Sequence, residues 1–143
     1  MFTVFGHRGL PSKAPENTLA SFKAASEVEG AQWLELDVGI TKDEQLIIIH
    51  GDYLERTTTM SGEITQLNYS EMKETSAGLW YGAEFKEERL PTFKQIVELA
   101  NTYQMNLNVE LKGVTGPNGT ALSRSMVEQV HYQLQAVSYT HLT

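Results

Sequence analysis

A histidine and an arginine stand between two glycines near the start of the chain, in the stretch Gly6-His7-Arg8-Gly9. Glycine lets the backbone turn sharply and approach a ligand closely. Histidine exchanges protons near neutral pH, and arginine is a permanent cation that binds anionic oxygens. This stretch therefore suits acid/base chemistry on an anionic substrate. The alternative is a strand-to-helix junction that happens to carry an exposed histidine.

Further along the chain, two pairs of charged residues are spaced for one face of a strand. Glu35 and Asp37 are two positions apart, as are Glu110 and Lys112, and side chains at this spacing leave the same face. Three carboxylates brought together raise at least one pKa unless a cation lies between them. Because oxygen ligands favour hard ions, Glu35, Asp37 and Glu110 are candidate ligands of Mg²⁺ or Ca²⁺. Surface ion pairs on a solvent-facing strand are the alternative.

A second histidine, His50, directly follows the aliphatic run at 46–49. If His50 and His7 both lie at strand ends, two imidazoles could flank one phosphorus, one as a base and the other as an acid. Arg8 suits a non-bridging phosphate oxygen, and Lys112 is a second candidate cation for it. The alternatives are a hydrogen-bonded histidine that caps a buried strand and an ordinary solvated lysine.

The elements that must position these groups alternate between strand and helix. Apolar patterns predict strands at 3–6, 33–38, 46–50 and 105–111, and helices at 17–29, 92–103 and 120–135. The first helix is expected to begin near Pro15 or Asn17, to bury Leu19, Phe22, Ala25 and Val28, and to end at Gly30. Thr92 and Gln95 form a predicted capping box for the second helix. The pattern is typical of an α/β protein with a mainly parallel sheet.

Two connections in this alternation differ from the rest. Too few residues separate the strands at 33–38 and 46–50 for a helical crossover, so we expect an antiparallel hairpin there. Residues 51–90 have weak periodicity and predict a long excursion with one short helix near 70–75. Trp80, Tyr81 and Phe85 lie in this excursion, where we expect them to wall the alcohol side of the substrate pocket, with a small satellite core under a loop as the alternative.

Length and composition limit the classes of protein to which the chain could belong. At 143 residues, with 41% hydrophobic and 20% charged residues, it is predicted to form one domain. The formal net charge of −7 argues against nucleic acid or an anionic membrane as the main partner. No apolar run is long enough for stable membrane insertion, and no secretory signal is visible. The absence of cysteine fits a cytoplasmic protein. No oligomeric state is predicted.

Six short motifs together resemble the glycerophosphodiester phosphodiesterase family, in its order and roughly its spacing over residues 2–113. The matching pieces are His7-Arg8-Gly9, Pro15-Glu16-Asn17-Thr18, Glu35-Leu36-Asp37-Val38 with Thr41-Lys42-Asp43, His50 with Arg56-Thr57-Thr58, Leu90-Pro91-Thr92, and Glu110-Leu111-Lys112.

The resemblance implies a TIM-barrel-type (β/α)8 fold with its active site at the carboxyl ends of the strands. It implies Glu35, Asp37 and Glu110 as metal ligands, His7 and His50 as the acid/base pair, and residues 51–90 as a small insertion over the site. The implied substrate is a small glycerophosphodiester, hydrolysed to glycerol 3-phosphate and an alcohol.

The chain departs from the family in two ways. The family usually has an aspartate directly after the second histidine, where this chain has Gly51, and Asp52 could substitute for it. The family's barrel needs about 250 residues, so residues 1–136 are expected to form only its N-terminal half. Half a barrel leaves open sheet edges, so we expect this chain alone to be inactive and poorly soluble.

Two other functions remain open at this point. One is a related phospholipase-type barrel that acts on lysophospholipids, and the other is a non-catalytic module that binds a phosphate ester. Residues 137–143 resemble translated adapter or vector sequence, so this segment is predicted to be a non-native tail, and His141 is assigned to no site.

Overall fold

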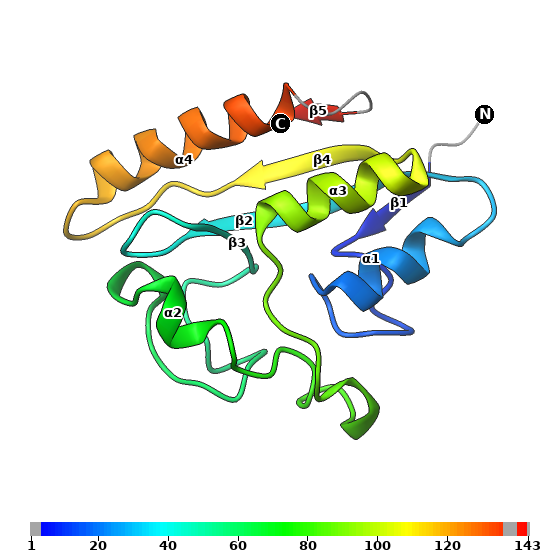
Figure 1. Ribbon diagram of the computed structural model, residues 1–143, viewed down its shortest axis with the longest axis horizontal. Helices are drawn as coiled ribbons and strands as arrows, with labels where there is room; N and C mark the ends of the chain where they lie inside the picture. The colour runs from blue at the N-terminus through cyan, green and yellow to red at the C-terminus, as the bar shows by residue number, and fades with distance from the viewer. Residues whose placement is uncertain (1–3, 136–139, 143) are drawn as a thin grey trace.

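The computed structural model describes residues 4–135 and 140–142, and its centre is a mainly parallel sheet (Figure 1). Strands β1, β2, β4 and β5 follow one another in this order and pair in parallel, and β3 pairs with β2 antiparallel. The bounds of β1 to β5 are Val4–His7, Ala31–Ile40, Leu46–Ile48, Asn106–Leu111 and Thr140–Leu142. The predicted α/β class and the predicted hairpin are both confirmed.

Three longer helices cover one face of this sheet: α1 (Leu19–Ser26), α3 (Phe93–Tyr103) and α4 (Gly119–Leu134). The alternating residues Leu34, Leu36, Val38 and Ile40 of β2 belong to one buried cluster with apolar side chains of all three helices. Because successive side chains of a strand point to opposite faces, Glu35 and Asp37 point away from the helices. The face opposite the helices therefore carries the predicted site.

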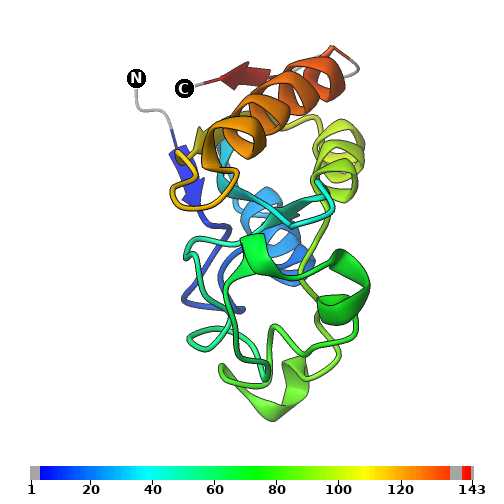
Figure 2. The same cartoon turned by 90° about the vertical axis from the view of Figure 1, so that its left-hand side faces the viewer.

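The excursion between β3 and α3 forms a lobe of its own beyond the end of the sheet. Figures 1 and 2 show its green ribbon on the opposite side of the molecule from α4. Its short elements are η1 (Ile64–Gln66), α2 (Tyr69–Met72) and η2 (Ala83–Phe85). The lobe has a second buried cluster, which contains Ile47, Ile49, Leu54, Ile64, Met72, Ala77 and Leu90. The predicted short helix is present as α2, whereas the two 3₁₀ turns were not predicted.

The first helix differs most from its predicted bounds. Asn17 has φ 55°, a left-handed conformation that a helix cannot contain, so the helix begins at Leu19, with Thr18 as the N-cap that accepts from the Ser21 N–H. It ends at Ser26, before the expected stop at Gly30. Val28 consequently lies outside the helix and is 40% exposed rather than buried.

Several other boundaries differ from prediction by a few residues. Strand β2 is longer than the predicted 33–38, and β3 ends at Ile48 rather than at residue 50. Thr92 forms the predicted capping box with Gln95 at the start of α3. Strand β5 falls inside the predicted non-native tail, residues 137–143, part of which lies outside the described residues. The origin of that tail, like the predicted inactivity of the chain alone, stays a prediction.

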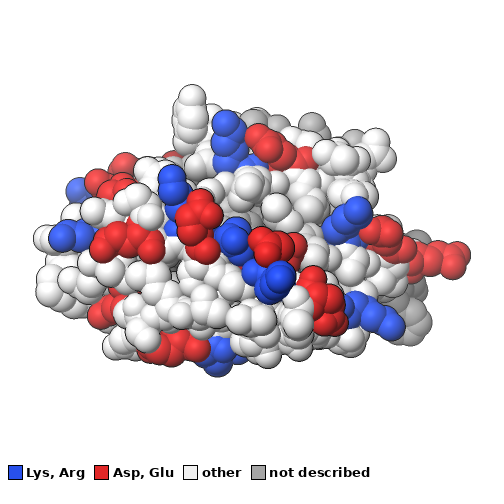
Figure 3. Space-filling model, turned by 60° about the horizontal axis from the view of Figure 1, so that its bottom comes forward, with Lys and Arg blue, Asp and Glu red and all other residues white. Residues whose placement is uncertain are grey.

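The charged side chains on one face are shown in Figure 3, where basic and acidic groups are interspersed. On this face the described residues form no continuous basic patch, and the absence of a nucleic-acid partner stays a prediction. In the part of the chain that the structure describes, no helix combines the length and apolar character that crossing a membrane requires.

Candidate active site

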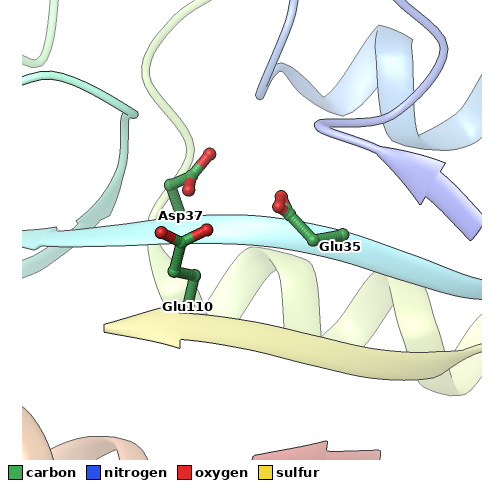
Figure 4. A group of neighbouring side chains, drawn as sticks. All are labelled: Glu35, Asp37 and Glu110. Atoms are coloured by element: carbon green, nitrogen blue, oxygen red, sulfur yellow. The ribbon is translucent and has the colours of Figure 1, made fainter. Parts of the chain in front are cut away.

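Strand register brings three carboxylates to one point on the face opposite the helices. Asp37 on β2 pairs with Glu110 on β4, and Glu35 lies two residues before Asp37. One oxygen from each of the three carboxylates lies within 4.8 Å of the others. Figure 4 shows all three side chains leaving the same side of the two strands. The convergence predicted from spacing is therefore present.

A divalent cation fits this group of residues. Glu35 and Asp37 are buried, at 8% and 1% exposure, whereas Glu110 is exposed. The Glu35 Oε1 and Asp37 Oδ1 atoms are buried and accept no hydrogen bond, although buried polar atoms normally have a partner. Burial, followed by the charges of Asp37 and Glu110, raises the pKa of Glu35 from 4.5 to about 7. A hard cation between these oxygens would relieve both the desolvation and the repulsion.

The raised pKa of Glu35 predicts that the metal-free protein loses stability as pH rises from about 4.5 to about 7. In this window the folded state binds more protons at Glu35 than the unfolded state does, so the free energy of unfolding falls with pH. Mg²⁺ or Ca²⁺ should offset the loss, and its affinity should increase through the same window because it displaces the Glu35 proton.

Melting temperatures measured against pH, with a chelator and with each ion, test this prediction. Glu35→Gln is the control because its side chain does not titrate. Without metal, the melting temperature of the unaltered protein should fall relative to that of Glu35→Gln as pH rises. A difference that stays constant with pH would contradict the assignment.

The two candidate histidines lie on either side of the carboxylates. His7 pairs with Glu35 in the register of β1 and β2, and its Nε2 is 3.8 Å from Glu35 Oε2, with a largely exposed ring. His50 follows Ile49, whose N–H donates to the Asp37 carbonyl over 3.0 Å. The structure thus places His7 beside Glu35 and His50 beside Asp37.

His50 is held by a lysine rather than by an aspartate. The Lys112 ammonium donates to the His50 carbonyl over 2.9 Å and lies 3.3 Å from His50 Nε2. Burial, Arg8 and Lys112 lower the pKa of His50, so its neutral form is favoured. Asp52 is exposed, and no described hydrogen bond joins its carboxylate to His50. A Cβ atom at Gly51 would make only ordinary van der Waals contact, with the Tyr53 backbone.

The candidate phosphate cation Arg8 belongs to a chain of charges that the sequence did not reveal. Its Nε lies 3.3 Å from Asp37 Oδ2, and its NH1 lies 3.4 Å from Glu16 Oε2. Arg56 donates to both Glu16 oxygens, over 3.0 and 2.8 Å. Although burial opposes the shift, the hydrogen bond and charge of Arg56 and the charge of Arg8 lower the pKa of Glu16.

The residues of this charge chain could be found in the sequence motifs, but the motifs did not indicate their role. Glu16, Asn17 and Arg56 all lie in motifs that carried the family resemblance, and none was assigned to the site. Side-chain pairings between separate loops have no fixed spacing, so only the structure connects these residues. Glu16 and Arg56 are 40 positions apart in the chain.

The three aromatic residues of the excursion form one cluster. Tyr81 contacts Trp80 and Phe85 edge to face, with ring centroids 5.7 and 5.4 Å apart. The Tyr81 hydroxyl donates to the Pro11 carbonyl over 2.8 Å, which ties the excursion to the loop after β1. Trp80 remains 44% exposed. Their predicted contact with substrate, like that of Lys112 with phosphate, stays a prediction.

Comparisons with known proteins identify the family of this chain. A model of the glycerophosphoryl diester phosphodiesterase family matches residues 7–137. A glycerophosphodiester phosphodiesterase of Caldanaerobacter subterraneus is 40% identical over 109 residues, which cover 76% of this chain and 44% of that protein. The chain thus spans less than half the length of this relative.

Solved structures of related proteins have a similar fold. A phosphodiesterase of Oleispira antarctica, in complex with the product sn-glycerol-3-phosphate, has a TM-score of 0.87 and 35% identity over 99% of this chain and 56% of that one. A glycerophosphodiester phosphodiesterase from Agrobacterium tumefaciens has a TM-score of 0.76 and 29% identity over 100% of this chain and 57% of that one. These relatives have TIM-barrel-type folds, to part of which the sheet and helices described above correspond. The chain therefore belongs to the glycerophosphoryl diester phosphodiesterase family.

Proposed function

We propose that this protein catalyses the metal-dependent hydrolysis of glycerophosphodiesters to glycerol 3-phosphate and an alcohol. The observation that carries the proposal is the group of three carboxylates within 4.8 Å, with a histidine on either side and Arg8 in contact. The product complex of the Oleispira antarctica relative supports this substrate class. A module that only binds a phosphate ester would not require both histidines.

In the proposed mechanism, Glu35, Asp37 and Glu110 hold one divalent ion. A divalent ion bound there would supply Lewis-acid polarisation of the phosphate and a lowered pKa for a bound hydroxyl group. His50, whose lowered pKa favours the neutral imidazole, accepts the proton of the attacking oxygen. His7 donates a proton to the leaving alcohol oxygen as its bond to phosphorus breaks.

The positive charges around the reacting centre have separate roles in this mechanism. Lys112 holds His50 through its backbone carbonyl and opposes protonation of the ring. Arg8 binds a non-bridging phosphate oxygen while Glu16 and Asp37 fix its guanidinium. The attacking oxygen is that of water, or that of the glycerol 2-hydroxyl followed by water opening a cyclic phosphate.

Product analysis with two substrates tests the proposed function. The experiment uses the protein as encoded, with any residues that its reading frame adds to this chain. Glycerophosphocholine should yield glycerol 3-phosphate in the presence of Mg²⁺ or Ca²⁺, and lysophosphatidylcholine should react more slowly. Preferential cleavage of lysophosphatidylcholine would favour the phospholipase-type alternative, and binding without turnover would favour the binding module.

Trp80 should influence which alcohol the site accepts. Its ring is exposed and belongs to the aromatic cluster that contacts the loop after β1. Trp80→Ala should therefore change the order of kcat/KM among choline, ethanolamine and glycerol diesters, since these share the glycerol phosphate and differ only in the alcohol. An equal loss for all three diesters would show that the ring serves the lobe's packing instead. Tyr132→Ala is the matched control, because Tyr132 is an exposed aromatic residue on α4.

A further inference from the structure

Asn17 lies at the junction between the loop after β1 and helix α1, in a backbone conformation that the surrounding chain holds in place. Its φ is 55°, and its N–H donates to the Arg8 carbonyl over 2.9 Å. Arg8 is also left-handed, with φ 56°, and its own N–H donates to the Glu35 carbonyl. The Ser21 hydroxyl donates to the same Arg8 carbonyl over 3.2 Å. The position of Asn17 is therefore fixed relative to β2.

The Asn17 side chain is directed at one oxygen of a candidate metal ligand. It is 3% exposed, and its Nδ2 donates to Asp37 Oδ2 over 3.1 Å. An ionised carboxylate only accepts hydrogen bonds, so the NH₂ end of the amide must face it. Asp37 Oδ2 also lies 3.3 Å from Arg8 Nε. The second oxygen, Oδ1, is buried and accepts no hydrogen bond.

The difference in partners between the two Asp37 oxygens determines which of them is available to a metal ion. The terminal torsion of an aspartate side chain is broad and roughly two-fold, so the strand alone does not determine where each oxygen points. The Asn17 hydrogen bond and the Arg8 ion pair both engage Oδ2, which selects one orientation and leaves Oδ1 for a further partner. Oδ1 belongs to the carboxylate that converges with those of Glu35 and Glu110.

We propose that Asn17 is a positioning residue of the metal site, which holds Asp37 Oδ2 so that Oδ1 is presented to the divalent ion. The inference rests on the proposed function because it requires the ion. Without Asn17, Oδ2 loses this hydrogen bond and keeps its ion pair with Arg8, so the carboxylate can rotate toward the Arg8 guanidinium. Groups that orient a metal ligand in this way typically contribute 10-fold to 100-fold in affinity.

Two substitutions remove the contact while keeping the left-handed backbone accessible. Asn17→Asp preserves shape and tolerates φ near 55°, but its ionised side chain cannot donate and repels Asp37. Asn17→Gly also accepts this φ and removes the amide without adding charge. Asn118→Asp is the matched control, because Asn118 has φ 60° at the start of α4 and its side chain makes no capping hydrogen bond.

Calorimetric titration of the metal-free encoded protein with Mg²⁺ and with Ca²⁺ tests the proposal without an activity assay. Both Asn17 variants should bind about 10-fold to 100-fold more weakly, with the larger loss for Asn17→Asp, while Asn118→Asp should bind like the unaltered protein. Melting temperatures of the metal-free proteins are measured in parallel. A folded Asn17→Gly variant with weakened metal binding would support a positioning role even if Asn17→Asp failed to fold.

Three results would overturn the inference, and they differ in whether the proposed metal site is rejected with it. Unchanged affinity in a folded Asn17→Gly variant would reject the role of Asn17 and leave the metal site standing. A loss of metal binding no larger than the fraction of unfolded variant explains would show that Asn17 serves the fold. Unfolding of both variants would show the same. No ion binding by the unaltered protein would reject both the inference and the proposed metal site.

Discussion

Replacing His50 or His7 with alanine should lower kcat for glycerophosphocholine about 10²-fold to 10⁴-fold, the usual contribution of a general acid or base. His50 is poised to accept a proton because burial and the nearby cations Arg8 and Lys112 lower its pKa. His7 lies beside Glu35 with a largely exposed ring. Neither ring belongs to the two apolar clusters of the fold. Both variants should therefore melt near the temperature of the unaltered protein.

The control for this prediction is a histidine of the same chain outside the site. His131→Ala should leave kcat unchanged, because His131 is exposed on α4, and its contact with Gln135 is long, at 3.5 Å. Rate and melting temperature are measured on the same samples. If either site variant unfolded, or kept the rate of the unaltered protein, that histidine would not be a catalytic residue.

Replacing Glu110 with alanine should abolish detectable binding of Mg²⁺ and Ca²⁺. Glu110 is the single candidate ligand on β4 and completes the group that Glu35 and Asp37 begin on β2. A hard cation held by two carboxylates instead of three loses both charge and geometry. Because Glu110 is exposed, its removal leaves no cavity and should not unfold the protein.

Glu44 provides the matched control for Glu110. It is an exposed carboxylate in the turn before β3, and its φ of 63° suits glycine. Glu44→Gly therefore removes one negative charge without backbone strain and should leave the calorimetric affinity unchanged. Equal affinities of Glu110→Ala and the unaltered protein would exclude Glu110 from the site.

The shared face of Glu35 and Asp37 could be predicted because it follows from a local rule. Alternation along a strand places Glu35 and Asp37 on one face, opposite Leu34 and Leu36, which contact the helices. Similar reasoning gave the hairpin from a short connection and the start of α3 from the Thr92 capping box. Each of these features depends on residues that are close in the chain, whereas Glu110 joins Glu35 and Asp37 through the parallel pairing of β2 with β4.

The features that the sequence did not predict depend on distant pairings or on single dihedral angles. The late start of α1 follows from the left-handed φ of Asn17, which hydrogen bonds to the neighbouring strand and loop impose. The contact of Lys112 with His50 joins residues 62 positions apart. The links from Arg56 through Glu16 and Arg8 to Asp37 join two loops to a strand. The periodicity of apolar residues along the sequence does not predict such contacts.

Phosphorus NMR of glycerophosphocholine incubated with the encoded protein tests the central claim most directly. The proposed function predicts that the phosphodiester signal is replaced by the phosphomonoester signal of glycerol 3-phosphate when Mg²⁺ or Ca²⁺ is present. A chelator should stop the conversion, and Glu110→Ala should show none at the same protein concentration. A diester signal that persists with both ions, or conversion that continues in the chelated protein, would contradict metal-dependent diester hydrolysis at this site.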